Sequence, residues 1–151
     1  MKNNILNRVA EELFSILPLI GRSIRRKLLK TALTSFNKDI APPHFEIMKL
    51  LQESGTLHIA EIAERLQIAG PQMTHLIDKL VDLDIVERQT GTADRRTINI
   101  TLTGKGKTTL EEHNSRLRNA IRKTLSRLTG EELEDLSASL RKLRDIFLKL
   151  Q

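Results

Sequence analysis

Hydrophobic residues recur every three or four positions over residues 5–35, a spacing that places them on one face of an α-helix. Pro18 interrupts this stripe, because its ring removes a backbone donor and collides with the carbonyl of Phe14. We therefore predict one long helix with a kink between Phe14 and Gly21. The stripe consists of Ile5, Val9, Leu13, Ile16, Leu17, Ile20, Ile24 and Leu28.

Three shorter stripes follow, and the last two predict a helix-turn-helix. The sequence Ala41-Pro42-Pro43 cannot continue the first helix and suits the start of a new one, which should stop near Gly55. His58 stands where the next helix could be capped, and Gln67 to Gly70 form a turn before a third helix. Two short helices joined by about four residues are typical of a helix-turn-helix. The apolar positions are Phe45, Met48 and Leu51, then Ile59, Ile62, Ala63 and Leu66, then Met73, Leu76, Ile77, Leu80 and Leu83.

The period of the pattern then falls to two, which indicates strands. Ile85 to Arg88 is a short strand candidate, and Thr97 to Leu102 alternates polar and apolar residues as a half-buried strand does. The polar segment from Gln89 to Arg96 contains a glycine and fits the loop of a β-hairpin. This hairpin would be a wing appended to the helix-turn-helix.

Helical spacing returns after Gly106, and a last helix follows Thr129 with the acidic residues Glu131 and Glu132 in its first turn. The predicted fold class is therefore mainly α with a small β component: a winged helix-turn-helix with long N- and C-terminal helices. We divide this one structural unit into an N-terminal dimerisation helix (1–40), a DNA-binding lobe (41–106) and C-terminal dimerisation helices (107–151). The long amphipathic segments exceed what so small a centre can cover, which predicts a symmetric homodimer.

The composition narrows the classes of function. The chain has no cysteine, which excludes disulfides, thiol nucleophiles and thiolate metal sites. No apolar run suits a membrane span, so we expect a soluble, cytoplasmic protein without a membrane partner. A formal net charge of +6 favours an anionic partner. Residues 1–40 hold eight Lys and Arg against three Asp and Glu, whereas residues 55–107 hold seven of each, so net charge alone does not identify the binding surface.

The third helix (70–83) carries polar side chains opposite its apolar stripe. Gln, Thr, His and Lys side chains there can donate to phosphates and to base edges in the major groove, as a recognition helix requires. A helix face that only contacts solvent is the alternative. The preceding helix and the following hairpin favour DNA contact.

The predicted wing tip carries Asp94, Arg95 and Arg96. Asp94 is near enough to hold one guanidinium group in a fixed orientation. A narrow minor groove concentrates negative potential and attracts inserted arginines, and we choose Arg96 as the inserted residue. Alternatively, this is an exposed arginine pair without a role.

We find no catalytic constellation, and we expect neither enzyme activity nor a metal or cofactor. The segment Leu102 to Thr108 ends like a phosphate-binding P-loop, but Thr101 stands where that pattern demands glycine, and only a hairpin is predicted where a parallel sheet is needed. The histidines have neither the short spacing nor the neighbouring Cys or carboxylate residues of a metal site; they are His44, His58, His75 and His113. A nucleotide hydrolase, and a helical adaptor that binds protein through the basic residues 22–30, remain as alternatives.

The order of these elements resembles the MarR family of bacterial and archaeal transcription regulators. The resemblance spans essentially the whole chain and is most specific from Ile59 to Lys107. It is carried by the segments 41–45, 62–66, 74–80, 94–96 and 102–106. It implies a homodimer that binds pseudo-palindromic double-stranded DNA, usually as a repressor released by a small ligand, for which we expect an aromatic or phenolic compound.

The resemblance also implies site residues. DNA contacts would come from Gly70, Pro71, Gln72, Thr74, His75 and Lys79 on the recognition helix, and from Arg88, Asp94 and Arg96 on the wing, beside Arg95. An effector pocket would involve Ile20, Ile24, Phe45, Met48, Leu110 and His113, although these residues fit a plain core more readily. Two features depart from the family. Ala69 stands where a hydroxyl residue often caps the recognition helix, and without cysteine the thiol-oxidation branch cannot apply.

Overall fold

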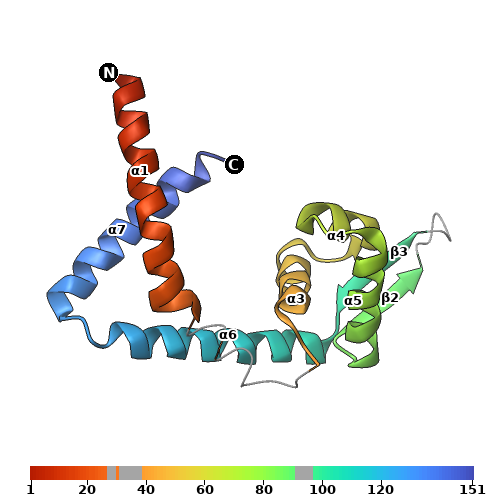
Figure 1. Ribbon diagram of the computed structural model, residues 1–151. Coiled ribbons are helices and arrows are strands. Elements are labelled where there is room, and N and C mark those ends of the chain that lie inside the picture. The colour runs from red at the N-terminus through yellow and green to blue at the C-terminus, as the bar shows by residue number, and fades with distance from the viewer. Residues whose placement is uncertain (27–29, 31–38, 91–96) are drawn as a thin grey trace. The chain divides into compact units, whose positions relative to one another are not determined.

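The computed structural model describes residues 1–26, 30, 39–90 and 97–151 (Figure 1). The chain divides into two compact units. Lys30–Leu117 forms the winged unit, and Met1–Leu29 together with Arg118–Gln151 forms the terminal-helix unit. Helix α6 (Gly104–Leu125) therefore contributes its first part to the winged unit and its last part to the terminal-helix unit.

The winged unit contains the predicted helix-turn-helix. Helix α3 (Pro42–Ser54) begins with prolines in its first turn and ends at Gly55, whose φ of 75° lies in the left-handed region that favours glycine. Helix α4 (Ile59–Leu66) follows, and the left-handed residue Gln67 ends it. Helix α5 (Gly70–Asp82) is the predicted third helix. The existence and order of these helices are confirmed.

Strands β1 (Leu57–His58), β2 (Val86–Thr90) and β3 (Ile98–Leu102) form an antiparallel sheet in the order β1-β3-β2. The predicted hairpin is confirmed: its register runs from Val86 opposite Leu102 to Thr90 opposite Ile98. Strand β1 was not predicted, because two residues are too few to show an alternating pattern. Among the described residues the sheet is wholly antiparallel, so it lacks the parallel strands on which a P-loop is built.

The core of the winged unit lies where the helices meet the sheet. Its fully buried side chains come from every predicted stripe in this region: Ile47, Met48, Ile62, Met73, Ile77, Leu80, Val86, Ile100 and Leu110. Burying one such side chain contributes about 1.5–3 kcal/mol. The helix-turn-helix and the hairpin are thus held together by one shared core.

A close junction joins the end of α5 to the start of α6. The hydroxyl of Thr103 lies 2.6 Å from the carbonyl oxygen of Asp84 and accepts from the N–H of Gly106 at 2.9 Å. Gly106 is buried, and a Cβ there would collide with the carbonyl oxygen of Ile85. The glycine of the P-loop-like segment is therefore required by the approach of two backbones.

The terminal-helix unit contains α1 (Lys2–Ile20), a π-helical turn η1 (Gly21–Arg25), the end of α6 and α7 (Gly130–Leu148). Helix α1 runs through Pro18, and the departure from α-helical bonding begins at Gly21, the end of the predicted window. Helix α7 begins with a reciprocal cap: the backbone N–H of Thr129 donates to Glu132 at 2.8 Å, and that of Glu132 donates to the Thr129 hydroxyl at 3.2 Å.

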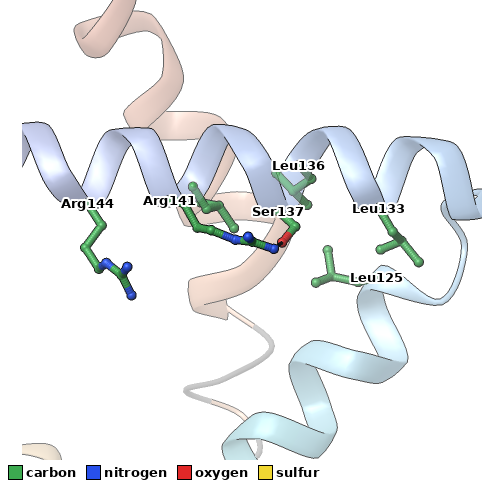
Figure 2. Close-up of a pocket in the computed structure, with 7 residues that line it drawn as sticks. Leu125, Leu133, Leu136, Ser137, Arg141 and Arg144 are labelled. Carbon is green, nitrogen blue, oxygen red and sulfur yellow. Dashed lines mark hydrogen bonds between the residues drawn. The ribbon is translucent and has the colours of Figure 1, made fainter.

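Both long helices of this unit expose apolar side chains. The large exposed ones on α1 and α7 include Leu6, Phe14, Leu17, Leu140, Ile146 and Leu148. A groove of about 400 Å³ runs along α7, and its lining includes leucines of α6 and α7 together with Arg141 (Figure 2). Within the described ranges, no helix combines the length and the apolar character needed to cross a membrane.

Candidate nucleic-acid interface

Helix α5 separates a buried apolar face from an exposed polar one. Met73, Ile77 and Leu80 are completely buried against the core. The opposite face of its N-terminal half is exposed to solvent and consists of Gly70, Pro71, Gln72, Thr74 and His75. The core therefore fixes this helix by its back and leaves the predicted DNA-contacting residues accessible.

The start of α5 has no side-chain cap, as the alanine predicted. Ala69 occupies the N-cap position and offers no side-chain acceptor. The exposed hydroxyl of Thr74 donates to the carbonyl of Gly70 at 3.1 Å, so its oxygen can still accept a hydrogen bond. A helix N-terminus carries a partial positive charge, so this end of α5 is electrostatically suited to approach a phosphate.

Lys79 lies on the same helix but is already paired. Its Nζ lies 3.7 Å from Oδ1 of Asp39, and both side chains are partly exposed. The pair stands at a groove of about 620 Å³ between α5 and the segment leading into α3, which Asp39, His44, His75, Leu76, Asp78, Lys79 and Asp82 line. A phosphate bound by Lys79 would compete with Asp39 for the ammonium group.

The strand arginine Arg88 is paired as well. Its Nη2 donates to Oδ1 of Asp78, so a side chain of β2 is tied to the recognition helix. Within the described part of the chain, one carboxylate oxygen takes one of the five N–H donors of this guanidinium group, and the others are available to a second acceptor.

The wing tip, with Asp94, Arg95 and Arg96, lies outside the described residues. The strands on either side define where it starts: Thr90 pairs with Ile98 at the end of the hairpin. The minor-groove role of Arg96 therefore stays a prediction.

Comparison with known proteins matches residues 40–98 to the MarR family model. The HTH-type transcriptional repressor MdtR of Bacillus subtilis is 30% identical to this chain over 125 residues, which cover 82% of this chain and 81% of the relative. The chain belongs to the MarR family. It is thus a transcription regulator of the winged helix-turn-helix type, and members of this family are DNA-binding regulators rather than enzymes.

Solved structures of MarR proteins share the fold. A MarR family protein from Bacillus stearothermophilus is 25% identical and superposes with a TM-score of 0.75, covering 94% of this chain and 97% of that one. The MarR family protein Rv2887 of Mycobacterium tuberculosis, in complex with salicylic acid, is 26% identical with a TM-score of 0.62, covering 85% and 93%.

Four of the residues predicted for a MarR effector pocket lie in the winged unit. Phe45, Met48 and Leu110 belong to its hydrophobic core. His113 stacks on Phe45, with ring centroids 3.6 Å apart and planes 9° from parallel. Ile20 and Ile24 belong to the terminal-helix unit instead. The four residues are therefore brought together as packed core.

Two buried histidines are held in the neutral form. Burial lowers the pKa of His113, and the charges of Lys49 and Arg116 lower it further. Burial is also the main cause of the lowered pKa of His44, whose Nδ1 accepts the backbone N–H of Ala41 at 2.9 Å. Neutral imidazole suits both positions, because a charge there would be poorly solvated.

Sequence reasoning missed the two acidic partners, Asp39 and Asp78. The sequence did contain a hint of the Arg88 pair. Arg88 lies two residues after the buried Val86, so both side chains leave the same face of β2. Nothing in the sequence reports that Asp78 of α5 lies within reach of that face.

Proposed function

We propose that this MarR protein is a homodimeric repressor that binds a pseudo-palindromic operator and is released from it by a small aromatic or phenolic effector. The observation that carries the proposal is the exposed polar face of α5, held from behind by a fully buried apolar face. A helix presented in this way fits the major groove of B-form DNA. Because its target is the chromosome, we place the protein in the cytoplasm.

Within the proposal, the DNA contacts divide by chemistry. Gln72, Thr74 and His75 reach base edges, and the backbone N–H of Gly70 approaches a phosphate, with the ring of Pro71 beside it. Lys79 and Arg88 bind phosphates. Arg96 enters the minor groove beside Arg95, oriented by Asp94. This division predicts that base specificity and salt dependence belong to different residues.

The apolar faces of the terminal-helix unit support the homodimer. Phe14 is 74% exposed on α1, and Leu148 is 60% exposed on α7. Apolar surface of this extent calls for a partner, and a second copy related by a two-fold axis supplies an identical face. We propose residues 1–40 and 107–151 as the dimerisation segments, with 41–106 as the DNA-binding lobe. The two-fold axis would present two α5 helices to half-sites about one helical turn apart.

The chemistry of the aromatic side chains and one relative support an aromatic effector. Rv2887 forms a complex with salicylic acid, an aromatic acid. In the present chain Phe45 and His113 offer stacking surfaces beside Met48 and Leu110, and we propose these four residues for the effector. Ile20 and Ile24, which the family resemblance also implied, belong to the terminal-helix unit. An effector at these residues must displace part of the packed core, so we expect weak binding that raises the dissociation rate of the DNA complex.

Selection of bound sites from random duplex DNA tests the central proposal. We expect an enriched inverted repeat, bound by a dimer with an affinity that falls steeply with salt. Analytical ultracentrifugation with and without this DNA gives the stoichiometry. A monomer, or a pool without any enriched sequence, would show the proposal to be wrong. Salicylic acid, with cyclohexanecarboxylic acid as the non-aromatic control, then tests release.

A further inference from the structure

Arg88 occupies an unusual position for a charged residue. In the register of the hairpin it stands opposite Ile100, which is fully buried, and two residues from Val86, which is 1% exposed. Side chains alternate along a strand, so the stem of Arg88 leaves β2 on the face that covers the core. Arg88 is itself exposed, with 38% of its side chain accessible, so the side chain starts on that face and its guanidinium group reaches solvent.

Asp78 meets this guanidinium group from the recognition helix. It lies on α5 between the buried Ile77 and the partly buried Lys79, with half of its side chain exposed. Its Oδ1 accepts from Nη2 of Arg88. The contact joins two elements that the proposed function assigns to DNA binding, and it restricts the rotamers that the arginine can adopt.

A carboxylate next to DNA would ordinarily oppose binding, because it repels phosphates. The remaining N–H groups of Arg88 offer the compensating gain, since a fork oriented in advance loses less rotamer freedom when it binds an acceptor. We propose that Asp78 is a positioning residue for DNA binding: it holds Arg88 against α5 so that the free N–H groups meet a phosphate beside the recognition helix. This inference rests on the proposed function.

The helix supplies a matched control for the test. Asp82 lies one turn further along α5, is exposed, and forms no ion pair among the residues that the structure describes. Asp78→Asn and Asp82→Asn remove the same charge from the same helix. If charge alone matters, both variants bind the selected operator as tightly as the wild type or up to about threefold more tightly. If Asp78 positions Arg88, only Asp78→Asn weakens binding, on the order of tenfold.

Three further measurements separate positioning from a folding defect. Asparagine keeps a neutral oxygen acceptor but loses the charged one, whereas Asp78→Glu keeps a carboxylate and should restore most of the affinity. The slope of log affinity against log salt should flatten by about 1 for each half-site in both Asp78→Asn and Arg88→Gln, because each loses one phosphate contact. A smaller folded fraction would leave that slope unchanged. In the Arg88→Gln background, Asp78→Asn should have no further effect.

Equal affinities for Asp78→Asn and Asp82→Asn, or wild-type affinity for Arg88→Gln, would overturn the inference while leaving the proposed function intact. Failure of the wild-type protein to select any sequence would overturn the proposed function itself. An Asp78→Asn variant that stays weaker in the Arg88→Gln background would show that Asp78 acts on something other than this arginine.

Discussion

Gly106→Ala tests whether the glycine-lysine segment before α6 is a backbone junction. The added methyl group meets the carbonyl oxygen of Ile85, and the side chain of Leu102 lies 3.0 Å away. That carbonyl also accepts the backbone N–H of Thr103 at 3.0 Å. Gly104, two residues earlier on the same helix, is exposed and has nothing within 4 Å of an added methyl group. It is therefore the matched control.

Opposing effects determine how much each substitution changes the free energy of unfolding. Alanine stabilises a helix relative to glycine by about 1 kcal/mol, which applies in part at Gly104 because it stands at the helix start. Overpacking at Gly106 costs about 1–3 kcal/mol, and weakening a hydrogen bond to the displaced carbonyl costs about 1 kcal/mol more. We expect Gly106→Ala to lower the free energy of unfolding by about 1–3 kcal/mol, and Gly104→Ala to leave it unchanged or raise it by up to about 1 kcal/mol.

Urea denaturation followed by circular dichroism measures both variants, at one protein concentration because dimerisation would add to stability. Equal midpoints for the two alanine variants would refute the steric reasoning. Midpoints that shift on addition of ATP would instead favour the phosphate-binding interpretation of the segment.

The other predictions concern binding and pH. Arg96→Ala should weaken operator binding by about 1–3 kcal/mol in a gel-shift titration, and unchanged affinity would remove the wing from the interface. Lys79→Ala should lower affinity for all sequences alike and flatten the salt slope by about 1 for each half-site; an unchanged slope would mean that Asp39 keeps the lysine from DNA. Because burial lowers the pKa values of His44 and His113 below the ordinary value of 6.5, the unfolded chain takes up protons first as pH falls through 6.5. The free energy of unfolding should therefore decline below that pH and be insensitive to these groups above it. His113→Gln should reduce the decline measured by urea denaturation between pH 7.5 and 5, and an identical pH profile would contradict the assignment to His113.

The sequence was sufficient to predict the helices and the hairpin, because each buries a periodic set of apolar residues. Met73, Ile77 and Leu80 form one face of α5 by spacing alone, and the structure buries all three completely. The absence of a side-chain cap on α5 was also predictable, because it depends only on Ala69, whose methyl group cannot accept a hydrogen bond. These features are local, and local patterns suffice for them.

The features that escaped prediction depend on distance in space. Strand β1 exists because Leu57 pairs with Ile100, more than forty residues away, and not because of its own composition. The acidic partners of Lys79 and Arg88 are likewise set by how α5 packs on its neighbours. The sequence therefore predicted which side chains of the candidate interface are donors. It did not predict that aspartates already pair with two of them, Lys79 and Arg88.

The bonds that follow α5 have a mechanical consequence. Lys105 donates to the carbonyl of Leu83 at 2.9 Å, and Thr103 contacts the next two carbonyls, those of Asp84 and Ile85. Residues at the start of α6 thus bind three successive carbonyls. The recognition helix cannot tilt or unwind at that end without breaking these hydrogen bonds. Under the proposed function, these bonds favour a switch that moves the winged unit as a rigid body. An effector would then change the separation of the two DNA-binding lobes of the dimer and leave each lobe folded.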